Sequence, residues 1–159
     1  MKLETGDLIM EKGTGIIDWG VKKVTNSEYS HVALVYDYPL IIQSHLLSGV
    51  HITNIDEIGE YDVYRYKGGL SKSQKKIVKE SSIQYLGIDY DLFQIFGYLW
   101  TAIFEGRNKF NNPNLIICSE LVDLVYNKLK IYILRDRFLG DITPEEVINP
   151  KLFDKIIDG

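Results

Sequence analysis

The sequence of 159 residues has few of the side chains from which disulfides and metal sites are built. It contains one cysteine, Cys118, and three histidines, His31, His45 and His51. A single cysteine excludes a disulfide within the chain, and so few thiols and imidazoles exclude a cysteine-rich zinc site. Nothing in the sequence supports a mixed site of histidine and carboxylate ligands, so we expect no metal ion.

The sequence also lacks a surplus of basic residues and a long apolar run. Lysine and arginine number 18 against 22 aspartates and glutamates, whereas proteins that bind nucleic acid normally carry excess positive charge. The longest apolar run, Ile95–Phe104, has about half of the roughly 20 residues that a membrane-spanning helix needs. The first residues, MKLETGDLIMEKG, contain no apolar core of a secretory signal. We therefore expect no nucleic-acid partner, no transmembrane segment and a cytoplasmic location.

What is present is typical of a soluble globular protein, with 45% hydrophobic and 25% charged residues, and the length fits one domain over residues 1–159. In the first half, β-branched and aromatic residues between turn-like residues predict short strands with the spacing of an antiparallel meander. Between the first two strands, Gly15–Thr25 predicts a short helix interrupted or weakened by Gly20. The predicted strands are Leu8–Met10, Val32–Tyr36 (extended back to His31), Leu40–His45, Val50–Thr53 and Val63–Tyr66.

After Gly68-Gly69 the spacing of apolar residues becomes helical. Ser71 or Ser73 can cap a helix that runs to about Leu86, and Thr143 followed by Pro144 marks the start of a last helix. Strands followed by helices predict an α+β fold, in which an antiparallel sheet packs against helices. The other two predicted helices are Asp91–Phe104 and Cys118–Lys130.

Cys118 stands where an apolar run ends and an amphipathic helix begins. The free N–H groups and the dipole of a helix N-terminus stabilise a thiolate, which lowers the pKa of the thiol and prepares a nucleophile. The same N–H groups could receive an oxyanion. The alternative is that Cys118 is simply a small buried side chain, as most free cysteines are.

A thiol catalyst needs an imidazole that takes and returns its proton. His31 is the best candidate, because it opens a strand directly after a polar, turn-like segment. If this strand forms a hairpin with Leu40–His45, then Gln43 or His45, which share one face of the second strand, could lie beside His31 and orient it. A histidine with a structural role and an ordinary polar strand residue are the alternatives for His31 and Gln43.

Six short motifs follow one another along the chain: Gly6-Asp7-Leu8-Ile9, Tyr29 to Tyr36, Ile41-Ile42-Gln43-Ser44 followed by Gly49-Val50, Gly87 with Tyr90-Asp91, Cys118 to Val122, and Thr143-Pro144-Glu145. In this order they resemble the circularly permuted NlpC/P60 proteins of the YiiX/YebB type. In that family, papain-like thiol hydrolases have a changed chain order, so that the histidine strand precedes the cysteine helix, as it does here. The resemblance runs over nearly the whole chain, and its strongest pair is SHVALVY with CSELV.

The resemblance implies a papain-like fold in which Cys118 is the nucleophile and His31 the base, with no cofactor. The third polar residue of the family, usually Glu or His, aligns with Gln43, so this sequence departs from the pattern there. An amide can orient His31 but stabilises an imidazolium less than a carboxylate does. His45 is the reserve candidate for this role, and we assign His51 to structure or surface.

These observations predict a cysteine hydrolase that cleaves an amide or ester bond through an acyl-thioester. The resemblance implies amidase or peptidase action on a small peptide or amide. Two alternatives stay open: a lipid acyltransferase or thioesterase similar to lecithin:retinol acyltransferase, acting on a lipid ester, and a silent binding module on the same fold. The apolar run Ile95–Phe104 motivates the first alternative, and the missing carboxylate at position 43 motivates the second.

Overall fold

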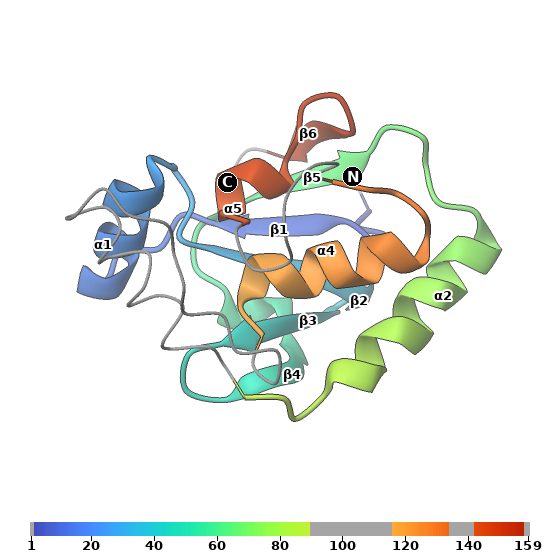
Figure 1. Cartoon of the computed structure of the whole chain (residues 1–159), viewed down its shortest axis with the longest axis horizontal. Coiled ribbons are helices and arrows are strands. Elements are labelled where there is room, and N and C mark those ends of the chain that lie inside the picture. Colours follow the sequence, from blue (N-terminus) through green and yellow to red (C-terminus); the bar gives the residue numbers. More distant parts are fainter. Residues whose placement is uncertain (1, 90–115, 134–141, 158–159) are drawn as a thin grey trace.

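The computed structural model describes residues 2–89, 116–133 and 142–157, and its centre is a six-stranded sheet in the order β4-β3-β2-β1-β5-β6 (Figure 1). Every neighbouring pair of strands is antiparallel. The α+β prediction, with an antiparallel sheet packed against helices, is therefore confirmed. The strands are β1 Leu8–Glu11, β2 His31–Asp37, β3 Leu40–His45, β4 Gly49–Asn54, β5 Tyr61–Tyr66 and β6 Phe153–Ile157.

The strand order corrects the predicted meander in its last step. β1 to β4 are consecutive neighbours, as predicted, but β5 pairs with the other edge of β1 instead of with β4. β6, which the sequence did not predict, extends the sheet beyond β5. Only Phe153 of this strand is buried, so β6 lacks the apolar alternation by which a strand is recognised in a sequence.

The helices begin where capping residues place them. Ser71 caps α2, where its Oγ accepts the N–H of Gln74 at 3.3 Å, and Thr143 caps the short helix α5 in the same way. The first helix, α1, is continuous, so the predicted interruption at Gly20 is wrong. The helices are α1 Ile16–Thr25, α2 Lys72–Ser82, α4 Cys118–Lys128 and α5 Pro144–Val147, with 3₁₀ turns at Ile55–Glu57 and Ile83–Tyr85.

Within the described part of the chain, no helix is long and apolar enough to cross a membrane. The helix predicted over Asp91–Phe104 and its apolar run Ile95–Phe104 lie outside the described residues. Tyr90 and Asp91, which follow Gly87 in the fourth motif, also lie outside the described residues.

Helix α4 packs across β2, and this packing fixes the site described below. Figure 1 shows α4 and α2 side by side over one face of the sheet. Because side chains alternate along a strand, Val32 and Leu34 of β2 join the buried core that contains Leu121 and Val125 of α4. The intervening Ala33 belongs to a second core, which also contains apolar residues of β1, β3 and β5 on the other side of the sheet.

Candidate active site

Cys118 is the first residue of α4 and is 4% exposed. The chain leading to it is held by two neighbours in space. Ser44 Oγ of β3 donates a hydrogen bond to the carbonyl of Ile116 at 2.5 Å, and the Ile116 N–H donates to the carbonyl of Asp89 at 3.1 Å. In the first turn, the Glu120 carboxylate accepts the N–H of Ile117 at 3.0 Å. The predicted placement of Cys118 at the start of a helix is therefore correct.

His31 is the first residue of β2, and its buried imidazole lies close enough to Cys118 for each group to shift the pKa of the other. On its other side, His31 Nε2 lies 2.8 Å from Oε1 of Gln43. An amide oxygen can only accept a hydrogen bond, so Nε2 carries the proton and donates it. Nδ1 is then the ring nitrogen that is left for the thiol.

Burial and charge act in opposite directions on this pair. Burial alone would lower the pKa of His31, but the charge and hydrogen bond of Cys118, followed by the hydrogen bond of Gln43, raise it to about 9. Burial alone would raise the pKa of Cys118, but the charge and hydrogen bond of His31 lower it. The backbone N–H groups of Val32 and Ser119 lower the pKa of Cys118 further. The geometry therefore favours a thiolate and an imidazolium side by side.

The β2–β3 hairpin brings both predicted orienting candidates to His31. Gln43 is 5% exposed and makes the direct hydrogen bond. The ring of His45 stands edge-on to His31, with 6.2 Å between the ring centroids, and its pKa is lowered by burial, then by the charges of His31 and His51. Of the two candidates, it is thus Gln43 that contacts the imidazole nitrogen.

His51 joins this group from the next strand, a contact that the sequence interpretation missed. It pairs with Gln43 across the β3–β4 hairpin, and its Nε2 lies 3.3 Å from the Gln43 Nε2. Its Nδ1 lies 3.0 Å from the carbonyl of Gly49. The sequence interpretation assigned His51 to structure or surface and gave it no contact with Gln43, and the signal that could have found this contact is the pairing of positions 43 and 51 in a short hairpin.

The order of these elements, with the histidine strand before the cysteine helix, agrees with the comparison with protein families. The family model of the permuted papain-like amidase enzymes, YaeF/YiiX, C92 family, matches residues 2–152. The chain belongs to this family. The YiiX-type resemblance and the papain-like fold inferred from the sequence motifs are thereby confirmed.

A solved structure similar to this C92 family member is the crystal structure of the metalloprotein yiiX from Escherichia coli O157:H7. The two chains superpose with a TM-score of 0.71 over 98% of this chain and 97% of that one, at 21% sequence identity. At this identity the likeness shows a common fold. The comparison with curated proteins gives no match.

The side chains at this site do not form a metal-binding set. Among the residues that the structure describes, no group of three or more His, Cys, Asp or Glu side chains is arranged to hold a metal ion. The Nε2 atoms of His31 and His51, which would be natural ligands, both contact the amide of Gln43 instead.

Proposed function

We propose that this C92 family member is a thiol-dependent amidase in which Cys118 is the nucleophile, His31 the general acid and base, and Gln43 the group that orients His31. The observation that carries the proposal is the placement of Cys118 at the start of α4 beside His31 at the start of β2, where each shifts the pKa of the other and Nε2 of His31 is bound to Gln43. Membership of an amidase family supports an amide or a peptide as the substrate.

In the proposed reaction, the Cys118 thiolate attacks the carbonyl carbon of the substrate, and the negative charge passes to the carbonyl oxygen. The N–H groups at the start of α4 point toward the developing charge and stabilise it. The imidazolium of His31 then gives its proton to the leaving amine as the C–N bond breaks, which produces an acyl-thioester. A water molecule attacks the thioester while His31 takes one of its protons, and the thiolate leaves as the acid is released.

Gln43 supports this cycle by fixing which nitrogen carries the proton whenever His31 is neutral. Because its oxygen accepts from Nε2, the face of the ring toward Cys118 presents Nδ1. A neutral amide stabilises the imidazolium less than a carboxylate would. The pair still gains from burial, since the attraction between the two charges is stronger where water is excluded.

A direct test is to trap the acyl-enzyme with an activated ester. The full-length protein is mixed with p-nitrophenyl acetate and its mass is followed by intact-protein mass spectrometry. We expect one acetyl group that neutral hydroxylamine removes, as it removes thioesters but not amides, and that is absent from Cys118→Ser. Protein denatured in guanidinium is the control for the ordinary reactivity of a free thiol.

The same experiment separates the amidase from a binding module on the same fold. Acetylation of native protein no faster than that of denatured protein would contradict the proposal. A His31→Ala variant that is acetylated and deacylated as fast as the wild type would contradict the role given to His31. Where acetylation follows the proposal, a panel of aminoacyl and peptidyl amides then identifies the acyl group that is turned over.

A further inference from the structure

We propose that His51 is a positioning residue that fixes the orientation of the Gln43 amide and, through it, the tautomer of His31. This inference rests on the proposed function, because a defined tautomer matters only if His31 exchanges protons with Cys118. It gives a role to a residue that touches neither the thiol nor His31 through a hydrogen bond.

The hydrogen-bond pattern begins at a backbone carbonyl of β4. The carbonyl oxygen of Gly49 can only accept, and it lies 3.0 Å from Nδ1 of His51, so Nδ1 carries a proton. Ser48 Oγ, at 3.2 Å from the same nitrogen, lies on the same side of the ring. In the neutral imidazole, Nε2 of His51 is then an acceptor.

That acceptor determines the next link. Nε2 of His51 lies 3.3 Å from the Gln43 side-chain nitrogen, which donates to it. With its nitrogen turned toward His51, Gln43 presents its oxygen to His31 at 2.8 Å. His31 must therefore hold its proton on Nε2 and offer Nδ1 to Cys118. Each step follows from the one before, and the first is set by the backbone of β4.

Without the acceptor at position 51, the amide of Gln43 has two orientations of similar energy beside a neutral His31. In the flipped orientation its NH₂ group faces His31, which can then keep the contact only by accepting through Nε2. The proton of a neutral His31 moves to Nδ1, where it faces the thiol and blocks proton transfer from it. His45 does not replace His51 in this role, because it contacts His31 and His51 only through ring edges, at centroid distances of 6.2 and 6.3 Å.

Substitutions of His51 that remove or keep a hydrogen-bond acceptor test this role. His51→Leu removes the acceptor, and the alkylation of Cys118 by iodoacetamide at pH 6 should fall roughly five- to tenfold, as for the loss of one buried hydrogen bond. His51→Gln, whose side-chain oxygen can accept from Gln43, should return the rate to within about twofold of the wild type. The absorbance of the thiolate at 240 nm should change in parallel.

Gln43→Glu supplies the matched background. A carboxylate accepts through both oxygens and has no orientation to fix, so His51→Leu should have no effect in the Gln43→Glu protein. A loss of the same size in both backgrounds would mean that His51 is merely structural, and would overturn the proposal. If His51→Leu does not fold, as judged by circular dichroism, His51→Phe keeps the ring shape without its nitrogens and takes its place.

The outcomes distinguish this inference from the proposed function. Enhanced reactivity of Cys118 in the wild type that His51→Leu leaves unchanged would overturn the role of His51 alone. Reactivity of the wild type that equals that of the denatured protein would overturn the proposed function, and the inference with it. A loss in His51→Leu, recovery in His51→Gln and no effect in the Gln43→Glu background would support both.

Discussion

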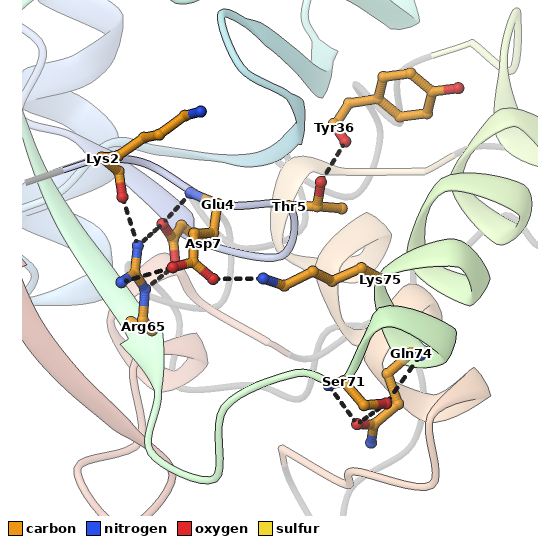
Figure 2. A network of polar contacts seen from close by, with 9 residues as sticks. All are labelled: Lys2, Glu4, Thr5, Asp7, Tyr36, Arg65, Ser71, Gln74 and Lys75. Atoms are coloured by element: carbon orange, nitrogen blue, oxygen red, sulfur yellow. Dashed lines mark hydrogen bonds and ion pairs between the residues drawn. The ribbon is translucent and has the colours of Figure 1, made fainter.

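Two groups of interacting polar side chains, each with a buried member at its centre, are built on different principles. Figure 2 shows the first, the Asp7 network, in which Arg65 points at Asp7 and Lys75 points at Glu4. The second is the group of side chains at the candidate active site, which we call the relay. The Asp7 network consists of Glu4, Asp7, Arg65 and Lys75, and the relay consists of Cys118, His31, Gln43 and His51.

In the Asp7 network, permanent charges are matched atom by atom. Asp7 Oδ1 accepts from Arg65 Nε at 2.7 Å, while Oδ2 accepts from Arg65 Nη2 at 2.6 Å and from the Glu4 N–H at 2.7 Å. Each of these hydrogen bonds runs from a guanidinium or backbone N–H to a carboxylate, so the donor and the acceptor cannot exchange roles. The network connects the N-terminal segment to β5, and its ion pairs act on the stability of the folded chain.

In the proposed relay, by contrast, the charges depend on the position of a proton between Cys118 and His31. Behind the pair, the roles proposed for Gln43 and His51 depend on the direction of their hydrogen bonds. The comparison teaches that a buried polar cluster is suited to catalysis when its protons can move and its donors and acceptors are fixed. The following substitutions test this contrast, from the largest expected effect to the smallest.

Arg65→Met should destabilise the protein by about 3–5 kcal/mol, because it leaves the buried carboxylate of Asp7 without its cation. Chemical denaturation measures the free energy of unfolding. The alkylation rate of Cys118 in the folded protein should stay at the wild-type value, since the two groups are independent. Lys67→Met is the control: Lys67 pairs with Asp154 at the exposed surface, 3.2 Å away, and its loss should cost about 0–1 kcal/mol. Equal costs for the two variants would contradict the contrast.

Gly49→Ala tests the backbone on which the relay rests. Gly49 has a φ of +62°, and a Cβ there would lie 2.3 Å from the carbonyl oxygen of Ile88. Gly69 has the same φ of +62° with nothing within 4 Å, so Gly69→Ala isolates the cost of the left-handed backbone. We expect Gly69→Ala to cost about 1–2 kcal/mol and Gly49→Ala about 2–4 kcal/mol, because the second adds a clash.

The difference between the two alanine variants is read from denaturant midpoints at constant m-value. Only Gly49→Ala should also slow the alkylation of Cys118, because its carbonyl anchors His51. A Gly49→Ala protein as stable as Gly69→Ala, with unchanged alkylation, would refute this description of the hairpin.

Ser44→Ala should cost about 1–2 kcal/mol, since it removes a buried hydrogen bond to the carbonyl of Ile116. Ser82 is a matched control, because it is equally buried. Its Oγ donates at 2.6 Å to the carbonyl oxygen of Val78, one turn earlier in the same helix. Ser82→Ala should leave the alkylation rate of Cys118 unchanged. Ser44→Ala should lower its alkylation rate a few fold, because the segment before Cys118 loses its tie to β3. Identical rates in the two variants would argue against that tie.

The sequence predicted the parts of this site that depend on local pattern. Cys118 at a helix start and His31 at a strand start follow from apolar spacing, and Gln43 follows from alternation in one short hairpin. The pairing of β1 with β5 and the presence of β6 could not be read in this way, because strand patterns do not specify their neighbours. Gly20 was overrated as an interruption: a Cβ there meets nothing within 4 Å, and a glycine in a helix costs only about 1 kcal/mol.

His51 was missed for a related reason. Its role depends on which side chain faces it across a hairpin, and on the donor and acceptor pattern that starts at the carbonyl of Gly49. Residue type alone does not carry this information. Histidines that pair across a hairpin with a residue beside a proposed base are worth testing in other sequences of this kind.

The central claim, that Cys118 and His31 form a thiolate and imidazolium pair, is tested most directly by the pH dependence of Cys118 alkylation. A lowered pKa of Cys118 means that the thiolate forms as the pH rises through a value below that of an ordinary thiol, so the wild type should already react fast at pH 6. A second change is expected near pH 9, where His31 loses its proton. In His31→Ala we expect a single rise near the ordinary thiol pKa of about 8.5 and a rate at pH 6 roughly 10- to 100-fold lower. A wild-type profile with one rise near pH 8.5, coincident with that of His31→Ala, would contradict the claim.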